Sequence, residues 1–246
     1  MLSIETFIEQ SHRSGSVDEL FEYYKKAMMM LGFDQIIFSL MTEHKNIERP
    51  AGHGIIANYS ESWMNYYGEK KYEDFDPVRR HMFAAPGLFV WDQLLEHVPT
   101  TTKTQKVLMH EGRDAGLKDG IGIPLHGPRG ALAGVGAASS DGGVDLDDKM
   151  LLSKAYLLAH QFYASFLELE AKRLQNYEAL PINLTDREQE VLKWCARGKT
   201  KAEIAAILGL SENTVHAYVK EALKKLGANN MTLGVLRALQ QGLIQI

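Results

Sequence analysis

The chain has 246 residues, of which 45% are hydrophobic and 24% charged, and its formal net charge is −4. This is the composition of a soluble globular protein, and the length suits two domains, one of about 170 residues and one of about 65. No apolar run approaches the roughly 20 residues needed to span a bilayer, so no membrane association is expected. The first residues do not resemble a signal peptide, and Cys195 is the single cysteine, expected to be a buried small hydrophobe, so we expect no disulfide framework and a reducing, cytoplasmic compartment.

The first 174 residues alternate between helical and strand patterns. Helices are expected over 4–31 (two helices), 59–67, 101–115 and 147–174, with another beginning at Asp76-Pro77. Strands are expected over 35–41, 50–56, 88–91, 120–124 and 131–138. Strands between helices on both faces indicate an α/β/α sandwich. The apolar stripe of the last helix is broader than one side of a small domain requires, so we expect this helix to form a dimer face.

Aromatic and polar side chains collect between Tyr59 and Trp91. Tyr59, Trp63 and Tyr67 recur every four residues and therefore share one helix face, while Asp76 follows in an apolar setting. Such a stripe is most often core, but each of these aromatics carries a polar tip, and buried polar groups need partners. Aromatic walls with a few donors and one carboxylate are typical of a pocket for a small amphipathic ligand. Spacing alone leaves the pocket and the plain core equally open.

A linker is expected over 175–183, where Pro181 resists helical continuation. It separates an N-terminal domain, residues 1–174, from a C-terminal domain, residues 184–246. From residue 181 onward the chain has nine Lys and Arg against six Asp and Glu, whereas the rest is acidic. The positive charge of the chain therefore lies in the C-terminal domain.

The C-terminal domain is predicted to contain four helices. The first begins at a capping box, Thr185 to Glu188, and the second ends at Gly209, where a left-handed turn is cheap only for glycine. Ser211 caps the third helix, and a last helix follows over 233–242. Helix, short glycine-containing turn and helix is the layout that places the second of the pair in a major groove, although an ordinary helical hairpin would look similar.

Donors suited to bases and phosphates lie on the polar face of that third helix and at the start of the helix before it. The expected DNA contacts are Thr200, Lys201, Asn213, Thr214, His216, Tyr218, Lys220 and Lys224, with Lys225 on the same polar face.

Together the two halves resemble the LuxR-type quorum-sensing transcription regulators, which bind N-acyl homoserine lactones. The resemblance covers nearly the whole chain. It is carried in the N-terminal domain by Trp63, Tyr67, Asp76-Pro77, Trp91 and Gly120, and in the C-terminal domain by Glu188, Leu192, Gly198 and the helix-turn-helix. It implies an α+β protein: an N-terminal α/β/α sandwich that binds the autoinducer and dimerises, followed by an all-α four-helix helix-turn-helix domain.

The resemblance also implies roles for single residues. Trp63 would donate its indole N–H to the lactone carbonyl, Asp76 would accept from the ligand amide, and Tyr59 would hydrogen-bond the acyl carbonyl. Ala133 aligns with a central-strand position where the family often has Ser or Thr, which would remove one hydrogen bond. The expected ligand contacts are Tyr59, Trp63, Tyr67, Asp76, Val78, Trp91 and Ala133.

The function implied is that of a homodimeric transcription factor, without cofactor or metal, whose binding to an inverted-repeat operator is controlled by the lactone, with RNA polymerase as a further partner. An orphan regulator that senses another small molecule through the same pocket is an alternative. A phosphorylated response regulator would need a doubly wound receiver, which the order of elements does not offer. An enzyme is disfavoured, because the chain has no HxxxH pair, no cysteine pair and no G-x-S-x-G.

Overall fold

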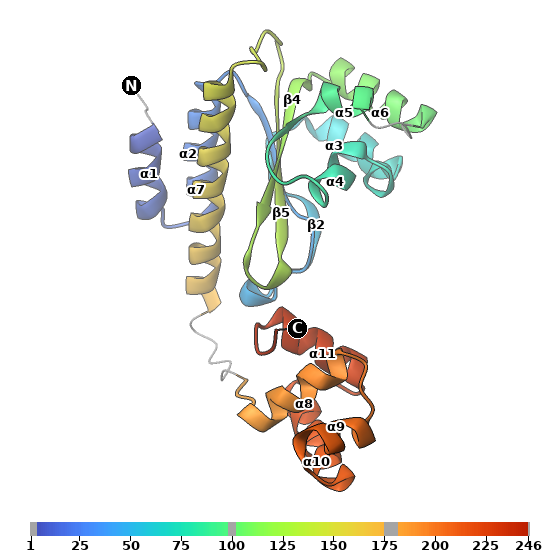
Figure 1. The fold of residues 1–246 in the computed structure, drawn as a ribbon. Helices are drawn as coiled ribbons and strands as arrows, with labels where there is room; N and C mark the ends of the chain where they lie inside the picture. Colours follow the sequence, from blue (N-terminus) through green and yellow to red (C-terminus); the bar gives the residue numbers. More distant parts are fainter. Residues whose placement is uncertain (1–3, 98–101, 175–181, 246) are drawn as a thin grey trace. The chain divides into compact units, whose positions relative to one another are not determined.

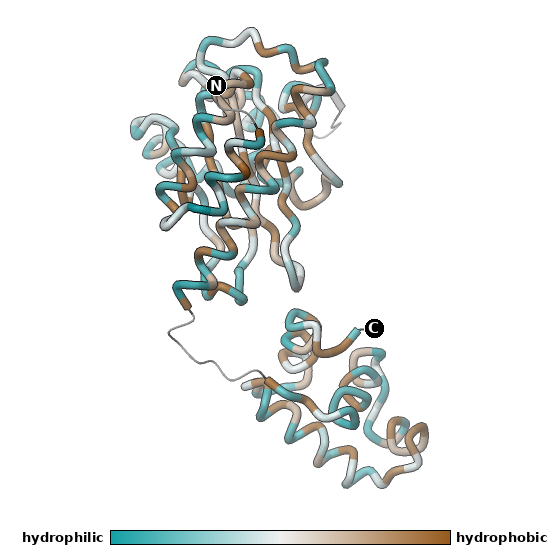
Figure 2. Tube along the Cα trace, turned by 90° about the vertical axis from the view of Figure 1, so that its left-hand side faces the viewer, coloured by the Kyte–Doolittle hydropathy of each residue, from teal (hydrophilic) through white to brown (hydrophobic). Residues whose placement is uncertain are grey.

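The computed structural model describes residues 4–97, 102–174 and 182–245, and the chain divides into two compact units, Met1–Asn176 and Tyr177–Ile246 (Figure 1). Most of the linker expected over 175–183, with Pro181, lies outside the described residues. Within the described part, no helix is both long enough and apolar enough to cross a membrane. In Figure 2 the helices of both units alternate between hydrophilic and hydrophobic residues, as expected of elements with one buried side.

The N-terminal unit is built on an antiparallel sheet with the strand order β2-β1-β5-β4-β3. Its strands are β1 (Gln35–Leu40), β2 (Gly52–Ala57), β3 (Phe89–Val90), β4 (Lys118–His126) and β5 (Leu132–Ser139). One face is covered by α2 (Val17–Met29) and α7 (Lys149–Leu174), and α1 (Ile4–Arg13) packs against these two helices on the side away from the sheet (Figure 1). The other is covered by α3 (Glu61–Glu69), α4 (Pro77–Met82), α5 (Trp91–His97) and α6 (Lys103–Asp114). Short 3-10 turns lie at Lys45–Ile47, Tyr72–Asp74 and Pro128–Gly130. The predicted α/β/α sandwich is confirmed.

The main core lies between the sheet and the helices α1, α2 and α7. Phe162 of α7 lies edge-on to Phe38 of β1 at 5.1 Å between ring centroids and is stacked on Tyr24 of α2 at 4.6 Å. Val135 of β5 packs into the same cluster. Because side chains alternate across a strand, the residues between these apolar ones face the other helical layer. On β5 two of them are Gly134 and Gly136, so the strand leaves room on that side.

One helix was not predicted. The pattern over 88–91 indicated a strand, but only Phe89 and Val90 pair with β4, and Trp91 already begins α5. Elsewhere the expected elements are present with shifted ends. The helix expected over 59–67 begins after Ser60, whose side chain accepts from the Trp63 N–H as an N-cap.

The C-terminal unit consists of α8 (Asp186–Ala196), α9 (Lys201–Leu208), α10 (Glu212–Lys225) and α11 (Met231–Gln240). Its helix ends follow the local signals: Thr185 and Glu188 form a capping box, Gly209 has a φ of 66°, and Ser211 caps α10. Buried apolar side chains from α8, α9 and α10, among them Val191, Ile204, Val215 and Val219, join the three helices. The second and third helices thus form the predicted helix-turn-helix.

Candidate functional site

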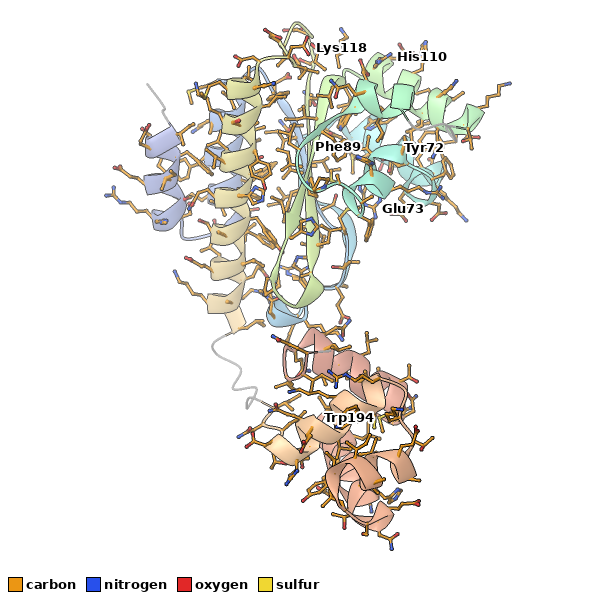
Figure 3. The ribbon with its side chains drawn as sticks, viewed as in Figure 1. Tyr72, Glu73, Phe89, His110, Lys118 and Trp194 are labelled. Carbon is orange, nitrogen blue, oxygen red and sulfur yellow. The ribbon has the colours of Figure 1, made fainter. Side chains whose placement is uncertain are left out.

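A cavity lies between the sheet and the helices α3 to α6. It holds about 800 Å³ of empty space, its mouth included. Six of the seven residues expected to touch the ligand line it: Tyr59, Trp63, Tyr67, Asp76, Val78 and Trp91. Figure 3 shows the side chains of Tyr72 and Phe89 on this side of the sheet, where Tyr72 packs with the cavity aromatics. Six of the seven residues expected to contact a ligand therefore lie around one cavity, on one side of the sheet.

Glycines form the floor of the cavity and explain its shape. A Cβ atom on Gly120 would lie 1.9 Å from the Trp91 ring, and one on Gly136 would lie 3.2 Å from the Tyr59 hydroxyl. Each aromatic thus lies against bare backbone; the approach of Trp91 to Gly120 is one that only glycine permits, and that of Tyr59 to Gly136 leaves little room for a larger residue.

Ala133 does not line the cavity, contrary to expectation. It is fully buried on the opposite face of the sheet, in the core beneath α7. The β5 positions that line the cavity are its neighbours Gly134 and Gly136. An error of one residue in a strand moves a side chain to the other face. The polar strand residue in the cavity wall is instead Ser39 of β1, which pairs with Gly134.

Asp76 is the N-cap of α4 and lines the cavity. Its Oδ1 accepts from the backbone N–H of Val78 at 2.7 Å and of Arg79 at 3.3 Å. Its Oδ2 accepts from the Tyr67 hydroxyl at 2.7 Å. Burial raises the pKa of Asp76 despite these hydrogen bonds. Since each carboxylate oxygen can accept more than one hydrogen bond, Oδ2 can still accept from a ligand donor.

Two buried polar atoms that line this cavity lack a hydrogen-bond partner among the described residues. They are the Tyr59 hydroxyl and the Trp91 indole nitrogen. Burial and the nearby charge of Asp76 raise the pKa of Tyr59, so the hydroxyl stays protonated and can donate. Leaving such a group unsatisfied costs about 1–3 kcal/mol, which a bound acceptor would recover.

Several cavity residues were missed by the sequence analysis. His53 of β2 stacks on Tyr67 at 4.7 Å between ring centroids, and its Nδ1 accepts from the Arg79 guanidinium at 3.0 Å. Burial, then the charge of Arg79, lowers the pKa of His53 to about 4. Asp92 and Arg113, an ion pair that joins α5 to α6, also line the cavity. Of these residues, only Ser39 could have been identified from the sequence, because it is a polar residue within an otherwise apolar strand.

Two tyrosines hold the outer helices together beside the cavity. Glu111 of α6 accepts from the hydroxyls of Tyr66, at 3.1 Å, and Tyr72, at 2.5 Å. His110, labelled in Figure 3, is exposed and pairs with Asp114 at 3.0 Å. Among the described residues no cluster of three or more His, Cys, Asp or Glu could hold a metal ion.

The second candidate site is the exposed face of the helix-turn-helix. On α10 the exposed residues among the predicted contacts are Asn213, His216, Lys220 and Lys224. Lys201, at the start of α9, donates to His216 Nδ1 at 2.7 Å and so links the two helices. Thr200 is the N-cap of α9.

Three polar residues of α10 contact other side chains of the C-terminal unit. The Thr214 hydroxyl lies 2.8 Å from that of Ser211, and Tyr218 is partly buried against the core of the unit. The Lys225 ammonium donates to both carboxylate oxygens of Glu188, at 2.9 and 2.8 Å. Lys225 therefore belongs to the packing of α10 on α8. Cys195, expected to be buried, is only half-buried.

Known proteins resemble both units. A model of the autoinducer binding domain matches residues 16–166, and one of bacterial regulatory proteins of the luxR family matches residues 182–239. Transcriptional activator protein AnoR of Acinetobacter nosocomialis is 32% identical over 92% of each chain. The crystal structure of Escherichia coli SdiA is 26% identical, with a TM-score of 0.70 over 99% of this chain and 98% of that one. A structure of SdiA in complex with octanoyl-rac-glycerol is 27% identical, with a TM-score of 0.69 over 98% and 94%.

Proposed function

Because the chain belongs to the luxR family of quorum-sensing transcription regulators, with an autoinducer-binding domain and a helix-turn-helix, we propose that its autoinducer is an N-acyl homoserine lactone. In this proposal Asp76 accepts from the amide N–H of the ligand. The Tyr59 hydroxyl donates to the acyl carbonyl and the Trp63 indole to the lactone carbonyl. Tyr67 and Val78 line the walls of the cavity.

One observation supports this ligand above others. An acceptor, the Asp76 carboxylate, and an unpartnered donor, the Tyr59 hydroxyl, line the same cavity close enough for the charge of Asp76 to raise the pKa of Tyr59. A secondary amide offers the complementary pair, one N–H and one carbonyl oxygen. The Trp91 indole N–H is a further donor for which a ligand oxygen would be a partner. Aromatic rings fill the remaining walls, as in pockets that enclose small ligands.

We propose that the protein acts as a homodimer through α7. The side chains of Met150 and Leu157 on this helix are 64% and 57% exposed, and Met29 on α2 is 58% exposed. Met150 and Leu157 are seven residues apart and therefore share one side of α7, and large apolar side chains grouped on one face are typical of a surface covered by a partner. A twofold dimer would present two copies of α10 to an inverted-repeat operator, with half-sites about one helical turn apart. The exposed side chains of α10 would contact the bases. The dimer would act in the cytoplasm and would contact RNA polymerase.

Ligand and DNA binding are coupled in this proposal through folding. A ligand that binds the folded state alone stabilises it by roughly 2.7 kcal/mol at a hundredfold excess over its Kd. Burying Tyr59 and Trp91 without partners weakens the empty domain, so the ligand would order the helices around the cavity.

The decisive experiment is a thermal-shift series on the purified chain with acyl homoserine lactones of different chain length. A concentration-dependent rise in Tm with one of them is expected.

An alternative function, sensing of a different acyl compound, is favoured by the octanoyl-rac-glycerol in a structure of SdiA. That ligand has no amide N–H for Asp76. A rise with octanoyl glycerol and none with any lactone would support the alternative and reject the lactone.

A further inference from the structure

Three polar residues line a part of the cavity that the amide-binding groups do not use. They are Ser39 of β1, His53 of β2 and Arg79 of α4. Arg79 Nη1 donates to His53 Nδ1 at 3.0 Å, and Ser39 Oγ lies 3.3 Å from the same nitrogen. Ser39 Oγ also accepts from the Gly54 N–H at 3.0 Å. This polar cluster of Ser39, His53 and Arg79 is therefore held in place by hydrogen bonds from the sheet.

The strand register gives the position of the polar cluster relative to Tyr59. The Tyr59 hydroxyl lies against Gly136, which pairs with Ile37, whereas Ser39 pairs with Gly134. The polar cluster is thus two strand residues farther along the floor, roughly 7 Å from the Tyr59 end. A ligand whose amide is held at Tyr59 would pass its acyl chain across this floor toward the polar cluster.

The polar cluster offers donors without matching acceptors. A guanidinium has five N–H donors, and the side chain of Arg79 uses one of them, toward His53, within the part of the chain described. No carboxylate of a described residue lies within 4.0 Å of the Arg79 guanidinium, which is the limit for an ion pair. Since His53 Nδ1 accepts from Arg79, the proton of the neutral imidazole is on Nε2, which is a further donor. A plain alkyl chain would cover these donors and leave them unpaired.

We propose that the acyl group of the natural ligand carries an oxygen acceptor, a hydroxyl or a carboxylate, that accepts hydrogen bonds from Arg79. The oxygen would lie roughly five carbon–carbon bonds beyond the amide carbonyl, given the spacing along the strand. This inference rests on the proposed function, because it takes the amide to be held by Asp76 and Tyr59. It makes Arg79 the residue that selects the acyl group.

Arg79 also acts on Asp76, and the test must separate the two roles. Its charge contributes to lowering the pKa of Asp76, against the larger effect of burial, and it lies three residues away on the same helix. If Arg79 served Asp76 alone, replacing it would weaken every lactone by the same factor. A contact with the acyl oxygen would instead weaken only the ligands that carry this oxygen. The quantity to measure is therefore the ratio of two dissociation constants.

The experiment is calorimetric titration of the full chain with three homoserine lactones: hexanoyl, ω-hydroxyhexanoyl and adipoyl. We expect at least one oxygenated ligand to bind at least about ten times more tightly than the hexanoyl lactone, which is the gain expected from a charge-assisted hydrogen bond. Arg79→Met should reduce this ratio to about one. Arg80→Met is the matched control, because Arg80 is the next residue of α4, is exposed and does not line the cavity. It should keep the ratio of the unmodified protein.

The two oxygenated ligands distinguish the source of the acceptor, a neutral hydroxyl or a carboxylate. If the unmodified protein binds the hexanoyl lactone as tightly as both oxygenated lactones, the inference is overturned and the proposed function still stands. This result needs no variant. A preference that survives Arg79→Met would overturn the role of Arg79. If none of the three six-carbon lactones binds, this inference fails, whereas the proposed function is rejected only if lactones of every chain length in the thermal-shift series also fail to raise the Tm.

Discussion

The Tyr67 hydroxyl donates to the Asp76 carboxylate at 2.7 Å, while the Tyr67 ring stacks on His53. Tyr67 therefore touches both polar parts of the cavity: the carboxylate proposed to hold the amide and the cluster proposed to hold the acyl oxygen. Asp76 in turn caps α4, the helix that carries Arg79. A ligand that fills the cavity would meet groups whose positions depend on one another, so changes at one end should be felt at the other.

Asp76→Asn should weaken lactone binding about tenfold at neutral pH, because a hydrogen bond to a charged acceptor is lost. Asn retains an oxygen to cap α4, so the fold should persist. Titration calorimetry of both proteins measures the effect. An unchanged affinity would remove Asp76 from amide binding.

The same residue predicts a pH dependence. Burial raises the pKa of Asp76 above its unfolded value, so its contribution to stability is complete below the unfolded pKa and is lost as the pH rises through the folded one. A ligand amide favours the ionised carboxylate and should bind more weakly as the pH falls through the raised pKa. As the pH is lowered through this range, the affinity for the lactone should decline in the unmodified protein and stay constant in Asp76→Asn.

Gly120→Ala should destabilise the N-terminal unit by about 1–3 kcal/mol and abolish the ligand-induced rise in Tm, because the new methyl group would displace Trp91. Gly68→Ala is the matched control: Gly68 lies in α3, a methyl group added there would have nothing within 4 Å, and Ala favours a helix. Chemical denaturation of the two variants compares them. Equal stability of both would show that Trp91 does not need the bare backbone.

Lys220→Ala should weaken operator binding and reduce the salt slope of log K by about one, if the exposed ammonium contacts a phosphate. The lactone-induced rise in Tm should not change. Lys103→Ala removes the same charge from an exposed position of the N-terminal unit and should leave the salt slope unaltered. Fluorescence anisotropy with operator DNA at several salt concentrations checks this, and equal slopes in all three proteins would exclude Lys220 from the interface.

Lys225→Met should instead lower stability. It leaves the buried Glu188 unpaired, at a cost of about 1–3 kcal/mol, moderated because the Lys225 side chain is 35% exposed. Burial acts to raise the pKa of Glu188, but hydrogen bonds from Lys225 and Thr185 outweigh it and hold the pKa below its ordinary value. That stability is present above the unfolded pKa and lost as the pH falls, so the variant should unfold at a higher pH. Acid titration by circular dichroism would detect the shift.

Leu157→Glu should yield monomers, because it places a charge on the proposed dimer face of α7. Phe83→Glu is the matched control: its side chain is 58% exposed against 57% for Leu157, and it follows α4 on the other side of the sheet. Sedimentation velocity on both variants tests the proposal. A dimer that persists in Leu157→Glu, or dissociates equally in Phe83→Glu, would contradict a dimer through this face.

The sequence by itself determined the helix-turn-helix and most of the elements of the sandwich. The ends of α8, α9 and α10 follow from Thr185, Gly209 and Ser211, whose effects act within a few residues of the chain. Trp63 and Tyr67 were equally legible, since helical periodicity places both on one side of α3, whereas Tyr59 precedes the N-cap Ser60 and so does not belong to the helix face expected for it.

Only the tertiary structure decided which side of β5 faces the cavity and which residues meet there. Each face of the strand has one larger apolar residue, Leu132 or Val135, among small ones, so its sequence carries little contrast to orient Ala133, and the packing of α7 against the sheet settles it. His53 and Arg79 are 26 residues apart and come together because β2 and α4 border the same cavity. Such contacts depend on the long-range pairing of strands and helices, which no local pattern encodes.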